Sequence, residues 1–376
     1  MLHNFSLFDL LITLGIIQGI ITSILLFRSK RNAYSNQFLA LAVLSFCFLC
    51  IKTLIHTLNL WDIPGFRYLP IGVELLIGPL IYLYVRSLIN PTFHFSKKSW
   101  LHFVPFLISQ AYAFIVYYLT LRVPNSLQKD TIAYSLHFDT VKTFEEYLIL
   151  ISVIVYLIIS YKELNTYKRW LHNSISDNTY PSFNWLNNIF RLSLVLGLFL
   201  LVNNLLDVFL KLRETHMFHW DALMVYVAFL IYYLGLSGYL QPDYTFIGNR
   251  KRSKKNNREI PEVKKIAIAN GLKQAMDIDK VFLNPTLTID KLASIVNTSS
   301  KNLSRVINQE YKKSFRDFIN EYRINEVKHK LKSKDYKSKS ILGIALECGF
   351  NSEASFYRVF KKVTQKSPKD FIQENK

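Results

Sequence analysis

Long apolar stretches separated by short polar ones fill the first 240 residues. The first covers residues 7–27, twenty-one positions with Asp9 as the only charge, enough helix to cross a hydrocarbon layer of about 30 Å. Six more follow, at 38–60, 68–88, 100–121, 144–161, 189–210 and 220–240. This pattern predicts a bundle of seven transmembrane helices. Because the fifth stretch is short, six and eight spans remain alternatives.

In the last hundred residues, apolar residues recur every three or four positions over short stretches, which predicts short helices. Over 340–363 an apolar stripe predicts one short helix, Gly349 predicts its end, and Ser352 is a good N-cap for the next helix. The inward residues would be Ile341, Ile344, Ala345 and Cys348, then Phe356, Val359, Phe360 and Val363. A second helix with a basic outer face, set at an angle by a sharp turn, suits a DNA major groove.

The same design occurs earlier, at 288–309. Thr288 caps a short helix, Asn297 and Thr298 make the turn, and Ser299 opens a second helix. The inward residues would be Ile289, Leu292, Ala293 and Val296, then Leu303, Val306 and Ile307. A longer helix over 314–331 joins the two units. The chain is therefore predicted to be all-α, with two helix-turn-helix units in one C-terminal domain.

These residues resemble a known family. The stretches LTIDKLASIVNTSSKNLSRVIN, SFRDFINEYRINEVKHKL and IALECGFNSEASFYRVFKKVTQKSPKDF are similar to the AraC-type bacterial transcription regulators. The resemblance covers roughly the last hundred residues. It implies a seven-helix domain whose two recognition helices enter successive major grooves of double-stranded DNA.

The resemblance also implies which side chains would contact DNA. Position by position, the first groove would be contacted by Lys301, Asn302, Ser304 and Arg305, and the second by Glu353, Ala354, Tyr357 and Arg358. Lys361 and Lys362 are assigned to phosphates, together with Lys312, Lys313 and Lys369. Two positions depart from the family pattern: Gln365 replaces a usual Gly, and Ile372 replaces a frequent Arg. Both follow the second recognition helix, so they concern C-terminal packing rather than DNA binding.

The charge is distributed unevenly. Residues 1–244 hold 17 Lys and Arg against 13 Asp and Glu, whereas residues 245–376 hold 29 against 14. Such a basic C-terminal third suits phosphate binding, with anionic lipid as a second use. We expect a transmembrane domain at 1–243, a basic linker and connecting helix at 244–272, and the DNA-binding domain at 273–376.

Basic residues between the apolar stretches predict the orientation of the bundle. RSKR follows the first stretch directly and no basic segment precedes it, which indicates an anchor with its N-terminus outside rather than a cleaved signal peptide. The loops after the first, third and fifth stretches hold nine Lys and Arg, and those after the second, fourth and sixth hold six. This bias, with an odd span count, places the C-terminal domain in the cytoplasm. A multi-pass protein of the inner (cytoplasmic) membrane, in contact with the lipid bilayer, is predicted.

Several polar residues fall inside the predicted spans. Lys52, His56, Glu74, Asn203 and Asp207 would all lie in the outer half of the membrane. Intramembrane charges are costly and often functional, so an outward-facing polar pocket for a signal is one hypothesis. The alternative is a structural pair, such as Lys52 with Glu74. Cys47 and Cys50 form a C-x-x-C motif without a partner pair, which favours packing over a metal or redox site.

Together these patterns predict a membrane-embedded one-component transcription regulator that binds promoter DNA. The alternatives are a transporter or membrane enzyme with a regulatory tail, and an assembly module. The sequence contains no G-x-S-x-G, H-E-x-x-H, P-loop or G-x-G-x-x-G motif, so no enzyme activity, cofactor or metal is expected. A homodimer and a contact with RNA polymerase stay open as further partners, and the signal ligand is not identified by the sequence.

Overall fold

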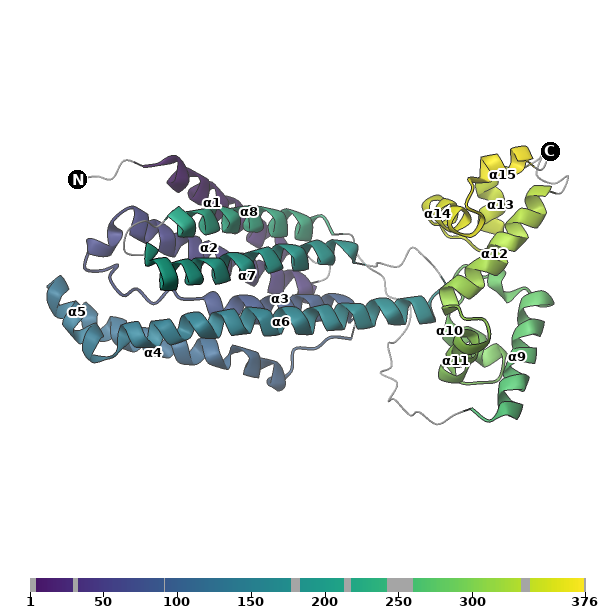
Figure 1. Cartoon of the computed structure of the whole chain (residues 1–376), viewed down its shortest axis with the longest axis horizontal. Helices are drawn as coiled ribbons and strands as arrows, with labels where there is room; N and C mark the ends of the chain where they lie inside the picture. The colour runs from purple at the N-terminus through teal and green to yellow at the C-terminus, as the bar shows by residue number, and fades with distance from the viewer. Residues whose placement is uncertain are drawn as a thin grey trace. The chain divides into compact units, whose positions relative to one another are not determined.

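The computed structural model describes residues 5–29, 33–90, 92–176, 183–212, 218–241, 260–332 and 339–374. Within these residues the protein is helical and contains no strand, which confirms the all-α prediction. The chain forms two compact units. Unit 1 comprises Met1–Leu164 and Phe183–Asn249, and unit 2 comprises Asn165–Ser182 and Arg250–Lys376. Figure 1 labels their helices.

Unit 1 contains the long apolar helices. Its helices are α1 (Leu7–Arg28), α2 (Ala33–Thr57), α3 (Glu74–Ile89), α4 (Val104–Leu121), α5 (Ser126–Ser135), α6 (Phe138–Ser174), α7 (Asn184–Leu210) and α8 (Phe218–Tyr239). Helix α6 contributes only its part up to Leu164 to this unit. In the described part of the chain, six helices are long and apolar enough to cross a membrane: α1, α2, α4 with the turn before it, α6, α7 and α8.

Helix α3 is the exception among the seven predicted spans. It has 16 residues, about 24 Å of helix, and residues 69–73 before it are not helical. Nearly all of its side chains are buried, from Leu75 to Ile89. Non-helical backbone at membrane depth is tolerated where protein encloses it. The predicted count of seven is therefore not established by helix length alone.

Small residues bring α1, α2 and α8 close together. A Cβ atom at Gly19 would overlap the side chains of Cys47 and Ile231, and one at Gly235 would overlap Thr22. Apolar helices in lipid gain little from the hydrophobic effect, so close packing at small residues stabilises such bundles. Cys47 is buried at this contact and carries no disulfide, which agrees with a packing role.

Unit 2 contains seven helices besides the end of α6 in the described residues. They are α9 (Glu262–Asp277), α10 (Ile289–Ile295), α11 (Ser300–Glu310), α12 (Phe315–Lys332), α13 (Ile341–Glu347), α14 (Glu353–Thr364) and α15 (Pro368–Glu374). Helix α12 joins two hydrophobic cores. Phe315, Phe318 and Ile319 belong to the first core, and Ile324 and Val327 to the second.

The inward faces predicted for both helix-turn-helix units are found, with one correction. Val363 is 41% exposed rather than inward, because it lies in the last turn of α14, beyond the second core. The predicted connecting helix corresponds to α9, which runs to Asp277. Ile268, Leu272 and Met276 of this helix lie in the first core.

Candidate nucleic-acid interface

The first helix-turn-helix unit is fixed by its caps. The Thr288 side chain accepts a hydrogen bond from Lys291 N at the start of α10, and the Ser299 side chain accepts one from Asn302 N at the start of α11. Between them Asn297 has φ 57°, and Thr298 N donates to the carbonyl of Ala293 at 2.8 Å. This 6→1 bond satisfies a carbonyl left open at the end of α10 and sets the angle of α11.

Helix α11 separates an apolar face from a polar one. Leu303, Val306 and Ile307 are fully buried. The four predicted DNA contacts of this helix, Lys301, Asn302, Ser304 and Arg305, are all partly exposed. Asn308, one turn further on, is exposed and donates to the Ser304 hydroxyl at 3.4 Å. The polar face of α11 therefore lies at the surface of the domain.

The second unit uses a glycine where the first uses Asn297. Gly349 has φ 89°, its N–H donates to the carbonyl of Leu346, and Phe350 N donates to that of Ala345. Ser352 then caps α14 by accepting from Ser355 N at 3.3 Å. Both turns are Schellman motifs, in which a left-handed residue ends the first helix.

Helix α14 presents its predicted contacts to solvent, apart from one aromatic residue. Glu353, Ala354, Arg358 and Lys361 are exposed. Tyr357 is half-buried, packs against the second core, and has its ring centroid 5.2 Å from that of Phe356. The packed ring fixes the side chain, so its hydroxyl would approach DNA with little loss of rotamer entropy.

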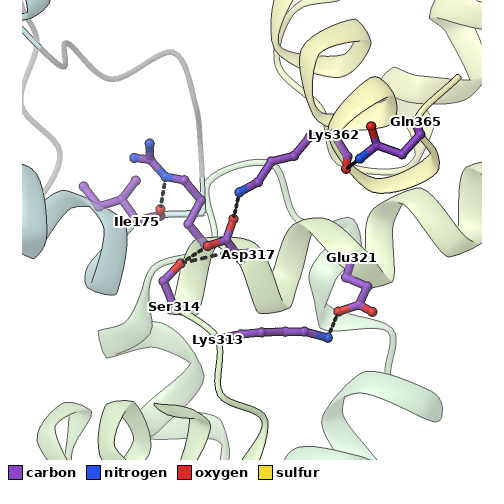
Figure 2. A network of polar contacts seen from close by, with 8 residues as sticks. Ile175, Lys313, Ser314, Asp317, Glu321, Lys362 and Gln365 are labelled. Carbon is purple, nitrogen blue, oxygen red and sulfur yellow. Dashed lines mark hydrogen bonds and ion pairs between the residues drawn. The ribbon is translucent and has the colours of Figure 1, made fainter. Parts of the chain in front are cut away.

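The two departures from the family pattern are accommodated in different ways. Gln365 ends α14 with φ 60°, so it adopts the left-handed conformation that a glycine takes at lower cost. Its side chain donates to the carbonyl of Lys362 at 3.1 Å (Figure 2). Ile372 is buried in the second core. The C-terminal packing is therefore kept without the Gly and the Arg.

Two of the lysines assigned to phosphates are bound to carboxylates. Lys362 Nζ lies 2.7 Å from Asp317 Oδ1, and Lys313 pairs with Glu321 (Figure 2). Burial would raise the pKa of Asp317, but hydrogen bonds from Lys362 and Ser314 hold this pKa below its usual range. The Asp317 carboxylate is therefore charged at neutral pH, and a DNA phosphate would have to replace it as the partner of Lys362.

Arg323 is a structural residue that the sequence analysis did not single out. Its side chain is 1% exposed, Nε donates to the carbonyl of Phe282 at 2.8 Å, and Nη2 donates to the carbonyl of Asn284 at 2.8 Å. A guanidinium with fixed acceptors on a neighbouring loop holds that loop against α12. In the sequence, only the apolar residues Ile324 and Val327 close to it on the same helix could have indicated a buried position.

Comparison with known proteins agrees with this geometry. Residues 292–374 match the family described as "Helix-turn-helix domain". An uncharacterized HTH-type transcriptional regulator of Staphylococcus aureus (strain MSSA476) is 33% identical over 98 residues, which are 26% of this chain and 13% of the relative. One of Haemophilus influenzae (strain ATCC 51907 / DSM 11121 / KW20 / Rd) is 35% identical over 83 residues, 22% of this chain and 27% of the relative.

These matches concern one domain. The chain aligns with only 13% of the length of the Staphylococcus aureus relative. No solved structure matches the chain. The seven-helix geometry and the matched residues identify the C-terminal domain as a helix-turn-helix domain of the AraC type, which confirms the resemblance.

The intramembrane residues predicted as one site form two groups. Lys52 Nζ of α2 lies 2.7 Å from Glu74 Oε1 at the start of α3. Lys142 and Glu145 form a second ion pair at 2.6 Å, and a Cβ atom at Gly72 would lie within 3.7 Å of Glu74, Lys142 and Glu145 atoms. Lys142 and Glu145 were not among the predicted site residues, because Lys142 lies outside the predicted span 144–161 and Glu145 lies at its edge.

The second group joins α7 to α8. Asp207 accepts hydrogen bonds from His219 Nε2 at 2.8 Å and from Trp220 Nε1 at 2.9 Å, and Asn203 donates to the His219 carbonyl at 3.0 Å. His56, the remaining predicted member, stacks on Trp61 at 4.9 Å between ring centroids. The described residues contain no cluster of His, Cys, Asp and Glu suited to a metal ion.

Proposed function

We propose that this chain is a membrane-embedded one-component transcription regulator that binds promoter DNA through α11 and α14. The observation that carries the proposal is the pair of capped recognition helices in one seven-helix unit, each with a buried apolar face and a polar outer face. Two such helices would enter major grooves about one helical turn, roughly 34 Å, apart. One chain would thus occupy an asymmetric site.

Genome-wide crosslinking of the full-length protein to DNA tests this proposal. A few discrete promoters should be enriched, and their enrichment should be lost when Arg305 and Arg358 are both replaced by alanine. A protein that enriches no DNA at normal abundance would favour the transporter or assembly hypothesis instead.

The proposed location is the cytoplasmic membrane, with the helix-turn-helix domain in the cytoplasm. Six apolar helices support insertion, and the charge bias of the loops supports the orientation. A further support is that residues 165–182, from a loop expected in the cytoplasm, belong to the same compact unit as the helix-turn-helix domain. An outside N-terminus also requires α3 to cross the bilayer, with residues 69–73 supplying the missing length.

Cysteine labelling of intact cells should show whether α3 crosses. Gly65→Cys precedes α3 at an exposed position where a Cβ atom meets nothing within 4 Å, and Lys98→Cys follows it at another exposed position. A membrane-impermeant maleimide should label the first from outside and the second only after permeabilisation. The native Cys47, Cys50 and Cys348 are buried, so the parent protein is the unlabelled control. Labelling of both variants from the same side would show that α3 does not cross.

We further propose that the group around Lys52 and Glu74 responds to the signal. Three charged side chains, those of Glu74, Lys142 and Glu145, meet at Gly72, a position without a side chain of its own. Lys52 of a third helix pairs with Glu74. The Glu74 side chain is 13% exposed and that of Lys52 is 43% exposed, so loss of Lys52 would leave a mostly buried carboxylate without this partner. Lys52→Met and Glu74→Gln should therefore each reduce regulation of the target promoter severalfold.

The double variant separates a signal site from a structural pair. Lys52→Met with Glu74→Gln removes both charges, so a merely structural pair should regain regulation, as neutral replacements of buried ion pairs often do. A signal site should remain unresponsive. Transcription of the crosslinked promoter under varied growth conditions, normalised to protein in the membrane fraction, is the measurement.

A further inference from the structure

The end of α6 belongs to the helix-turn-helix unit and not to the apolar unit. The last residues of α6, from Asn165 to Ser174, lie in unit 2, although α6 is one continuous helix from Phe138 to Ser174. Immediately after the helix, Ile175 forms an antiparallel β-bridge with Thr288, the N-cap of α10. The chain therefore places a segment of a predicted membrane helix against the first helix-turn-helix unit.

Arg316 binds the carboxyl end of α6. Its Nε donates to the carbonyl of Ile175 at 3.0 Å, and its Nη2 donates to that of Leu171 at 3.4 Å. The last carbonyls of a helix carry the negative end of the helix dipole, so a cation there is favourable. The Leu171 carbonyl also accepts from Ile175 N at 3.2 Å. Figure 2 shows the Ile175 carbonyl as the acceptor of the bond from Arg316 Nε. Arg316 thus acts as a C-cap supplied from 141 residues away.

The contact is buried and contains several hydrogen bonds. Ser176 is 0% exposed; its hydroxyl donates to the carbonyl of Leu287 at 2.7 Å and accepts from Arg323 Nη2 at 3.2 Å. Arg316 is 8% exposed. Guanidinium groups are costly to bury without acceptors, so burial of both arginines against this segment marks a docking surface rather than a passing contact.

The docked segment lies beside a residue expected to touch DNA. Asp317, the neighbour of Arg316, forms an ion pair with Lys362 of α14 at 2.7 Å. Figure 2 marks this contact with a dashed line. His172 lies within electrostatic range of Arg316, Asp317 and Lys362. The Asp317 carboxylate therefore occupies the Nζ of a lysine assigned to a DNA phosphate, and the docked turn of α6 lies next to this pair.

We propose that residues 171–176 are an intramolecular ligand of the helix-turn-helix unit and that their docking on Arg316, Arg323 and the Leu287–Thr288 backbone opposes DNA binding. Because α6 is continuous, a displacement of its apolar part would withdraw the docked turn from Arg316 and from the neighbouring Asp317–Lys362 pair. The competition with DNA rests on the proposed function. The docking itself does not.

A disulfide between residues 175 and 288 tests both parts. Directly opposed residues in an antiparallel bridge have Cα atoms about 4.5–5.5 Å apart, within the range that a disulfide spans. Full-length Ile175→Cys/Thr288→Cys should form the disulfide in membranes under mild oxidation, while either single variant should not. The oxidised protein should bind promoter DNA at least tenfold more weakly than the same protein after reduction.

Each outcome of this experiment is informative. Failure of the disulfide to form would overturn the docking. A locked protein that binds DNA as well as the reduced one would overturn the competition. If the disulfide forms but neither form binds any promoter, the docking stands, and the proposed function falls together with the competition.

A second variant removes the cap without adding a crosslink. Arg316→Met should release the end of α6 and raise promoter occupancy in cells severalfold. His329→Ala, an exposed residue on the same helix, is the matched control and should leave occupancy unchanged. Lower occupancy in Arg316→Met, at unchanged protein abundance and with the reduced form of the disulfide variant still active, would mean that docking favours DNA binding and would overturn the proposal.

Discussion

Replacing Arg305 and Arg358 together by alanine is expected to weaken binding to the crosslinked promoter by about 2–6 kcal/mol. A guanidinium that donates two hydrogen bonds to guanine discriminates by about 1–3 kcal/mol. The two arginines lie on different recognition helices, so their losses should add. Either single replacement should give about half of the total effect.

The measurement is a titration of the full-length protein with the promoter fragment and with random DNA of the same length, at several salt concentrations. On random DNA the loss should be much smaller. Lys361→Ala is the control for a phosphate contact: it should weaken binding to both DNAs equally and lower the salt slope by about one. Equal losses on both DNAs in the arginine variants would show that the arginines do not contact bases.

The helix-turn-helix geometry could be predicted from the sequence because each of its determinants is local. The caps Ser299 and Ser352 lie within three residues of the N–H groups that they accept from. The left-handed turn residues Asn297 and Gly349 adjoin the helices that they end. Short-range periodicity therefore specified both recognition helices and the faces that they expose.

The docking of α6 could not be predicted, because its acceptors are backbone carbonyls. Leu171 and Ile175 accept through groups that every residue has, and the donor, Arg316, lies more than 140 positions away. A basic residue on a helix of a basic domain gives no sign that its side chain is buried. The distribution of Lys and Arg among the loops predicted an orientation in the membrane, but it gave no information on this contact.

The polar residues inside the predicted spans could be predicted only in part. The sequence placed Lys52 and Glu74 in the same half of the membrane and offered them as a pair, and the structure pairs them at 2.7 Å. Asp207, which the sequence grouped with them, instead binds His219 and Trp220 of the next helix. Depth follows from position along a span, whereas the partner depends on how helices pack, which a single sequence does not specify.

Gly349→Ala is expected to destabilise the second helix-turn-helix unit by about 3 kcal/mol or more. At φ 89° an L-residue is strained, which costs roughly 1–2 kcal/mol. A Cβ atom would also lie 2.7 Å from the Phe282 carbonyl and 2.9 Å from Arg323 Nε, so it would push apart a buried hydrogen bond of 2.8 Å. Weakening a charged hydrogen bond adds roughly 1.5–3 kcal/mol.

Hydrogen exchange of the full-length protein can locate this loss. Amides of α13 and α14 should exchange more than a hundredfold faster in Gly349→Ala, since every 1.4 kcal/mol of opening free energy is about a factor of ten. Gly343→Ala is the control, because its Cβ atom would meet only Ser340 Oγ, at 3.2 Å, and the position is helical. This variant should change the free energy of opening by less than about 1 kcal/mol. Similar protection in the two variants would mean that the turn tolerates a side chain. The angle of α14 would then depend on the second core rather than on Gly349.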